Sequence, residues 1–159
     1  EKGSRGGTEN YPAIASMLVA LKDAIKDLDE FTKRAQWRDQ FEDSIIKAIP
    51  GTLVLGKESP RLWNTSMILL PKFDNLSWLG KLDKRGISVS TGSACSTARK
   101  EASELAGAIG LSYENGGRLL RVSSWLNTTD VEWMNLVSAL VQTHAELVED
   151  RNQSGVITL

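Results

Sequence analysis

The chain has 159 residues, a formal net charge of −1 and 25% charged residues, and it holds one Cys and one His. This length fits one domain with a core of its own, and the ordinary charged fraction argues against disorder of the whole chain. A single Cys cannot form an internal disulfide, and one Cys with one His cannot complete a closed zinc site. We therefore predict no disulfide and no metal centre.

Charge and hydropathy patterning exclude two classes of partner. The 19 basic and 20 acidic residues nearly balance, so no strong field would gather nucleic acid. No apolar run approaches the roughly 20 residues of a membrane span, and the first five residues do not resemble a signal peptide. We expect a soluble, cytoplasmic protein that binds neither nucleic acid nor a membrane.

The N-terminal third predicts a loop followed by helices. Residues 1–10 are rich in Gly and polar side chains, which is typical of a loop. Pro12 suits the first turn of a helix, and an apolar stripe follows at helical spacing. The stripe consists of Ile14, Leu18, Leu21, Ile25 and Leu28. The charged stretch 29–34 can bend or interrupt this helix, after which the helical period resumes and ends at Pro50-Gly51.

The middle of the chain predicts strands and one short helix. Residues 52–55 and 65–70 are short apolar runs bounded by Gly or Pro, which predicts two strands. Asp74 can cap a helix that continues through Leu82. Residues 87–90 predict a third short strand.

The C-terminal part predicts a loop, a strand and two helices. Residues 91–97 are small and polar and predict a loop, residues 101–109 a short helix, and residues 119–123 a strand. Thr129 and Glu132 match the capping box that opens a long final helix. The apolar stripe of this helix consists of Trp133, Val137, Leu140, His144 and Leu147.

This order of elements predicts an α+β fold in which a small mixed sheet packs against helices. Residues 11–150 would form the domain. Residues 1–10 would form a separate loop, and residues 151–159 a polar tail that frays.

Cys95 is the first candidate for chemistry. One interpretation is a buried structural thiol, as most free cysteines are. Its neighbours, from Ser90 to Thr97, are small and polar, however, and offer little apolar surface to pack against. A Cys on such a loop, with Arg99 and Lys100 nearby in sequence, can become a thiolate nucleophile.

Arg121 is the second candidate, because it stands within an apolar strand. It can point to water from an edge strand, or its planar guanidinium can clamp a carboxylate. Arg118 and Arg5 compete for the second role. His144 has only apolar residues three and four positions away, so we expect a packed histidine with one satisfied hydrogen bond and no catalytic role.

Four motifs together resemble the pyridoxal-phosphate-dependent cysteine desulfurases of the NifS/IscS type, within the class V aminotransferase family. Residues 89–96 are similar to the family's active-site cysteine loop, and residues 1–10 to its E-x-G-x-R-S-G-T-x-N segment. Residues 120–123 resemble the strand with the substrate-binding Arg, and residues 127–130 the start of the last helix. The resemblance implies the small C-terminal domain of a fold-type I enzyme.

The resemblance also implies roles for three residues. Cys95 would be the nucleophile that takes sulfur from L-cysteine as a persulfide while L-alanine is released, and Arg121 would bind the substrate carboxylate. Thr8 would hydrogen-bond the phosphate of pyridoxal 5'-phosphate across a homodimer interface. A sulfur-acceptor protein, as in iron–sulfur cluster assembly, would then receive the sulfur.

The chain also departs from the family pattern. It begins inside a family motif and has no lysine in a cofactor-lysine context, so we expect a large cofactor-binding domain upstream and an inactive fragment without it. Gly6 replaces a family Ser, Ala102 a family Pro, and Ser124-Trp125 a Leu-Gly pair beside the presumed carboxylate site. Two alternatives therefore stay open: another class V aminotransferase-like enzyme, or a non-catalytic dimerisation module.

Overall fold

A computed structural model describes residues 6–26, 28–91, 107 and 110–154. The chain divides into two compact units, residues 1–33 and residues 34–159. In the first unit, helix α1 (Tyr11–Lys26) carries the predicted apolar stripe, but none of its residues is buried. Helix α2 (Leu28–Ala48) begins before the charged stretch 29–34. This stretch is therefore helical and lies within α2, and it is not the point at which α1 ends.

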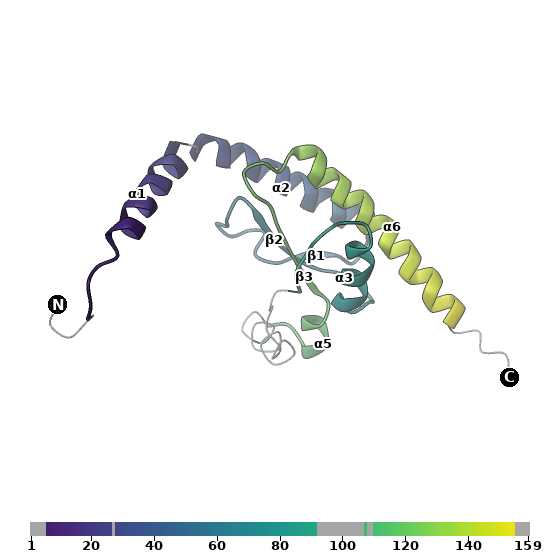
Figure 1. The fold of residues 1–159 in the computed structure, drawn as a ribbon. Coiled ribbons are helices and arrows are strands. Elements are labelled where there is room, and N and C mark those ends of the chain that lie inside the picture. Colours follow the sequence, from purple (N-terminus) through teal and green to yellow (C-terminus); the bar gives the residue numbers. More distant parts are fainter. Residues whose placement is uncertain (1–5, 27, 92–106, 108–109, 155–159) are drawn as a thin grey trace. The chain divides into compact units, whose positions relative to one another are not determined.

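The second unit contains the sheet. Strands β1 (Leu53–Val54), β2 (Thr65–Leu69) and β3 (Leu119–Ser123) lie in the order β1-β2-β3, and both pairings are antiparallel. The α+β class is confirmed, although the sheet is antiparallel rather than mixed within the described residues. The remaining helices are α3 (Asn75–Asp83), α5 (Tyr113–Gly116) and α6 (Asp130–Ser154). Figure 1 shows this arrangement.

The ends of the helices follow the predicted local signals. Asp74 caps α3, since its carboxylate accepts a 2.9 Å hydrogen bond from the Ser77 amide. At the start of α6 the Thr129 amide donates to the Glu132 carboxylate at 2.7 Å, and the Glu132 amide donates back to the Thr129 hydroxyl at 3.3 Å. Gly51 follows α2 with a φ of 92°, a conformation that favours glycine. The final helix extends to Ser154, four residues into the predicted polar tail.

The core lies between the sheet and α2, α3 and α6. Leu120 and Val122 alternate with Arg121 along β3, so that the apolar pair and the arginine occupy opposite faces of the sheet. Phe41 of α2 packs on Trp133 of α6 with ring centroids 5.0 Å apart. The other fully buried apolar residues include Ile45, Ile68, Leu70, Trp78, Leu82 and Leu140.

The predicted third strand, residues 87–90, is mostly wrong. Within the described residues only Ser90 pairs, through an isolated antiparallel bridge to Arg121. The alternating sequence supplies the right residue types, but residues 86–89 diverge from β3 instead of following it. The predicted helix 101–109 lies almost entirely outside the described residues, apart from residue 107.

The core predicts which apolar substitutions destabilise the chain. Leu140 of α6 is fully buried, so Leu140→Ala should lower the free energy of unfolding by about 2–5 kcal/mol. Leu21 of α1 is 53% exposed, so Leu21→Ala should change it by less than about 0.5 kcal/mol. Urea unfolding followed by circular dichroism measures both values. Equal losses for the two variants would contradict this account of the core.

Candidate functional site

Arg121 occupies the middle of β3 and is held from both sides of the strand. On one side it is the register partner of Met67 on β2. On the other side its amide donates to the Ser90 carbonyl at 2.7 Å, and the Ser90 amide donates to the Arg121 carbonyl at 3.0 Å. Its guanidinium Nη2 also lies 3.5 Å from the Ser90 hydroxyl. The half-buried side chain therefore starts from a fixed backbone, on the sheet face opposite the core.

The competing arginines are placed differently. The Arg118 guanidinium donates to the side chain of Asn115 at the end of α5, so it is engaged in a local contact. Arg5 lies outside the described residues. Of the three candidates, Arg121 is the one that the structure places in the middle of a paired strand.

Cys95 lies outside the described residues, as does most of the predicted loop 91–97. The described chain reaches Ser90 and Thr91, and Ser90 is the residue that pairs with Arg121. The described residues that precede Cys95 therefore end beside the candidate carboxylate clamp. The sequence predicted Cys95 and Arg121 as site residues, but it did not predict that Ser90 pairs with Arg121.

Thr8 belongs to the first unit, whereas Arg121 belongs to the second. Thr8 is exposed and follows Gly6 and Gly7, where an added Cβ would meet no atom within 4 Å. Asn10 then caps α1 by accepting a 3.1 Å hydrogen bond from the Ala13 amide. The Gly-Gly-Thr segment thus offers an exposed hydroxyl and an accessible backbone just before a helix.

His144 is packed among aromatic rings, as expected of a structural histidine. Its ring stacks on Trp78 with centroids 5.8 Å apart and an interplanar angle of 5°, and it meets the edge of Phe73 at 6.0 Å. The expected hydrogen bond is not found at Nε2, which is buried without a partner among the described residues. Burial, aided by the charge of Lys72, lowers the pKa of His144. These contacts give the ring a packing role.

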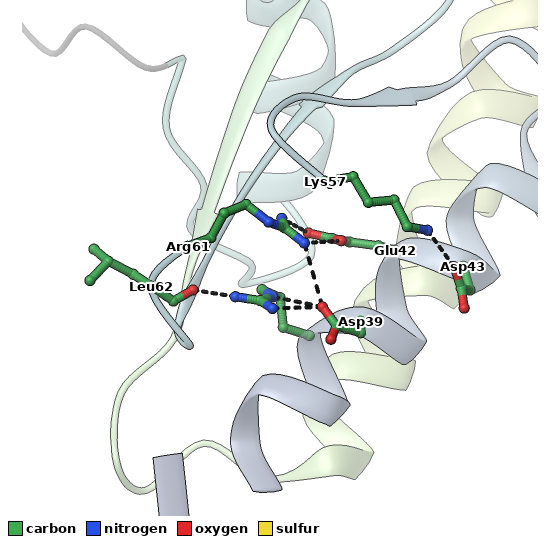
Figure 2. A network of polar contacts seen from close by, with 7 residues as sticks. Asp39, Glu42, Asp43, Lys57, Arg61 and Leu62 are labelled. Carbon is green, nitrogen blue, oxygen red and sulfur yellow. Dashed lines mark hydrogen bonds and ion pairs between the residues drawn. The ribbon is translucent and has the colours of Figure 1, made fainter. Parts of the chain in front are cut away.

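A polar network on α2 was not predicted from the sequence (Figure 2). Glu42 is fully buried and accepts two hydrogen bonds from the Arg61 guanidinium, at 2.6 and 2.9 Å. Arg38 donates to the Leu62 carbonyl and, at 2.7 Å, to Asp39. These bonds attach the segment between β1 and β2 to α2. The only sequence signal was the spacing of acidic residues on one face of a helix, which does not identify a cation that lies 19 residues away.

Neither a metal-binding cluster nor a membrane-spanning helix is present among the described residues. No group of three or more His, Cys, Asp or Glu side chains there could hold a metal ion. No helix of the described part is long and apolar enough to cross a membrane.

Comparison with known proteins identifies the class to which this fold and site belong. The profile of the family "Aminotransferase class-V" matches residues 2–132, and the chain belongs to this family. The resemblance to cysteine desulfurases is also confirmed. The cysteine desulfurase of Rhodobacter capsulatus is 34% identical over 92% of this chain, and "Cysteine desulfurase NifS" of Azotobacter vinelandii is 33% identical over 83% of it.

The aligned region is only part of these relatives. It covers 38% of the Rhodobacter protein and 33% of the Azotobacter protein, so the chain spans about a third of their length. The solved structure of a NifS-like protein from Rickettsia africae matches 91% of this chain and 37% of its own, with a TM-score of 0.75 at 24% identity. This last comparison supports the fold.

The buried ion pair predicts a large loss of stability when one partner is removed. Arg61→Met keeps the apolar stem of the side chain but leaves the Glu42 carboxylate buried without its cation. We expect the free energy of unfolding to fall by about 3 kcal/mol. Lys57→Met is the matched control, because its ion pair with Asp43 is more exposed and should contribute about 0–1 kcal/mol. A loss of less than 1 kcal/mol for Arg61→Met in urea unfolding would contradict this prediction.

The lowered pKa of His144 predicts a pH dependence of stability. The folded state disfavours the charged ring, so the unfolded state binds a proton more readily near neutral pH. The stability contributed by neutral His144 should be complete above the unfolded pKa, about 6.5, and decline as the pH falls below it. The chain has a single His, so His144→Gln should remove the decline between pH 7 and 5.5 in urea unfolding. An unchanged pH profile in the variant would overturn the assignment.

Proposed function

We propose that this chain is the C-terminal domain of a pyridoxal-phosphate-dependent cysteine desulfurase, which transfers sulfur from L-cysteine to Cys95 and releases L-alanine. The observation that carries the proposal is the Ser90–Arg121 bridge in a chain of the class V family. It joins the strand that bears the candidate carboxylate clamp to the segment that leads to the candidate nucleophile. The names of the relatives support the same reaction.

Arg121 would bind the α-carboxylate of the substrate. Its guanidinium is planar and can donate two parallel hydrogen bonds to a carboxylate. A residue anchored on a paired strand holds this geometry better than one on a loop, because its backbone does not have to be ordered on binding. The half-buried environment of Arg121 also weakens competition from water.

Cys95 would accept the sulfur. It lies five positions after Ser90, and an extended chain of that length spans at most about 18 Å. As a thiolate it would attack the substrate sulfur and form the S–S bond of a persulfide. The C–S bond would break and leave its electron pair on the β-carbon. This carbon would take up a proton and become the methyl group of the released alanine. An acceptor protein, such as one that assembles iron–sulfur clusters, would then take the terminal sulfur.

The residues of the first unit fit a phosphate group. The Thr8 hydroxyl is exposed, and the open space around Gly6 and Gly7 lets a ligand approach their backbone. Thr8 would hold the phosphate of pyridoxal 5'-phosphate in the other subunit of a homodimer. The cofactor, when bound, supplies the electron sink that makes the β-carbon–sulfur bond labile. The cytoplasm, where thiols stay reduced, suits such a nucleophile.

The apolar surface of α1 supports the presence of a larger domain in the working enzyme. Met17, Val19, Leu21 and Ile25 are each more than half exposed, and none of the α1 side chains is buried. The relatives are longer than the aligned region by about as much as one large domain requires. We propose that α1 packs on that domain, which would carry the lysine that binds the cofactor.

The direct test is the desulfurase reaction of the enzyme that contains this chain together with the large domain. Cys95→Ala should abolish sulfide release from L-cysteine, at least 100-fold, and leave the cofactor absorbance unchanged. Arg121→Lys should raise the KM for cysteine at least tenfold while the cofactor stays bound, because a single ammonium cannot form the bidentate contact.

The control and the alternatives are separated by the same assay. Arg118→Lys should leave KM within twofold, because Arg118 is engaged with Asn115. Full sulfide release by Cys95→Ala would contradict the proposal. Transamination without sulfide release would favour another class V enzyme, an alternative that the exposed Trp125 after β3 supports. Tight dimers of a chain that neither binds the cofactor nor reacts would favour a dimerisation module.

A further inference from the structure

A pocket of about 340 Å³ opens on the sheet face that α6 covers. Val122 and Ser123 of β3 line it, whereas Arg121 and Ser90, which form the candidate carboxylate clamp and its bridge, do not. The pocket belongs wholly to the second unit and to described residues. It is therefore separate from the site assigned above.

The pocket exists because the chain diverges from the Ser90–Arg121 bridge. Continued antiparallel pairing would place Ser88 opposite Ser123, but the bridge is isolated and no backbone hydrogen bond joins these two residues in the described part. Residues 86–89, which arch from the end of α3 toward β3, form one wall (Figure 1). β3 and the first turns of α6 form the others.

The floor of the pocket is apolar and its rim is polar. The apolar lining residues are Ile87, Val89, Val122, Trp133 and Leu136, and the last three are at least 90% buried. The rim holds Ser88, Ser123, Asn135 and Glu132, all of which are exposed. Such a floor with a few polar groups at its edge is typical of a site for a small amphipathic molecule.

Glu132 sets the charge that the pocket prefers. One carboxylate oxygen, Oε2, accepts hydrogen bonds from the amide and the hydroxyl of Thr129, at 2.7 and 2.8 Å. These bonds lower the pKa of Glu132, so the group is ionised at neutral pH. No ion pair involves Glu132 among the described residues. Arg34 forms no ion pair with Glu132 either, because its guanidinium donates to the carbonyl of Thr128 and lies over the Trp37 ring.

We propose that this pocket binds a small primary ammonium compound with an apolar body, its cation at Glu132 and its body against Trp133 and Leu136. Asn135 lies one helical turn after Glu132 and supplies an amide on the same side of α6. A carboxylate ligand would be repelled by the negative charge of Glu132 and would bind more weakly. An amino-acid zwitterion carries both charges, so the pocket discriminates against the substrate proposed for the desulfurase site.

The test titrates the full chain with benzylammonium chloride and follows backbone amides by NMR. Benzyl alcohol and benzoate are the matched probes, because all three have the same ring and similar size. We expect saturable shifts at Val89, Ser123 and Leu136 with benzylammonium, and at least fivefold weaker binding of benzyl alcohol and of benzoate. Shifts that do not saturate, or that map elsewhere, would overturn the proposal.

The decisive variant is Glu132→Gln, because Gln also completes a capping box and so preserves the start of α6. It should weaken benzylammonium binding at least fivefold and leave benzyl alcohol binding unchanged. Glu149→Gln, an exposed substitution about 25 Å further along the same helix, should change neither. Equal affinity of the wild type and Glu132→Gln for benzylammonium would refute the proposed contact. These readouts need neither cysteine nor cofactor, so they are independent of the desulfurase proposal.

Discussion

The backbone bridge between Ser90 and Arg121 is the constraint on which the candidate site depends. Two short hydrogen bonds, at 2.7 and 3.0 Å, join segments that lie 31 residues apart in the sequence. They hold the strand with the arginine against the end of the segment that continues toward Cys95. Without the bridge, the candidate carboxylate clamp and the candidate thiol would share no fixed reference point, and the proposed chemistry requires one.

The remainder of the second unit keeps β3 in place. Five residues of β3 pair in register with β2, and the apolar side chains Leu120 and Val122 fix which face meets the helices. The Glu42–Arg61 ion pair attaches the connection between β1 and β2 to α2, so the partner strand of β3 is itself held at one end. The core and the ion pair thus fix the position of β3, and with it the backbone of Arg121.

Local signals in the sequence predicted much of this fold. The apolar runs located β2 and β3, Asp74 and the Thr129–Glu132 box marked the starts of α3 and α6, and the final helical stripe identified the buried face of α6. Each of these depends on residues within one or two turns of one another. The prediction of a strand at 87–90 was mostly wrong, because a strand needs a partner with matching register and residues 86–89 do not pair with β3.

The candidate site was predictable only in part, for the same reason. The position of Arg121 in an apolar strand and the small residues around Cys95 were visible in the sequence. The contact between Ser90 and Arg121, the Glu42–Arg61 pair and the pocket beside Glu132 depend on tertiary packing. No spacing rule reports such contacts.

The central claim is that Cys95 receives sulfur beside the Arg121 clamp, and the most direct measurement is the mass of the peptide that contains Cys95. The enzyme that includes this chain would be mixed with L-cysteine for a single turnover, alkylated and digested. The account predicts a mass increase of one sulfur atom on Cys95, which Arg121→Lys suppresses at low cysteine concentration. An unmodified Cys95 in an enzyme that still releases alanine from cysteine would contradict it.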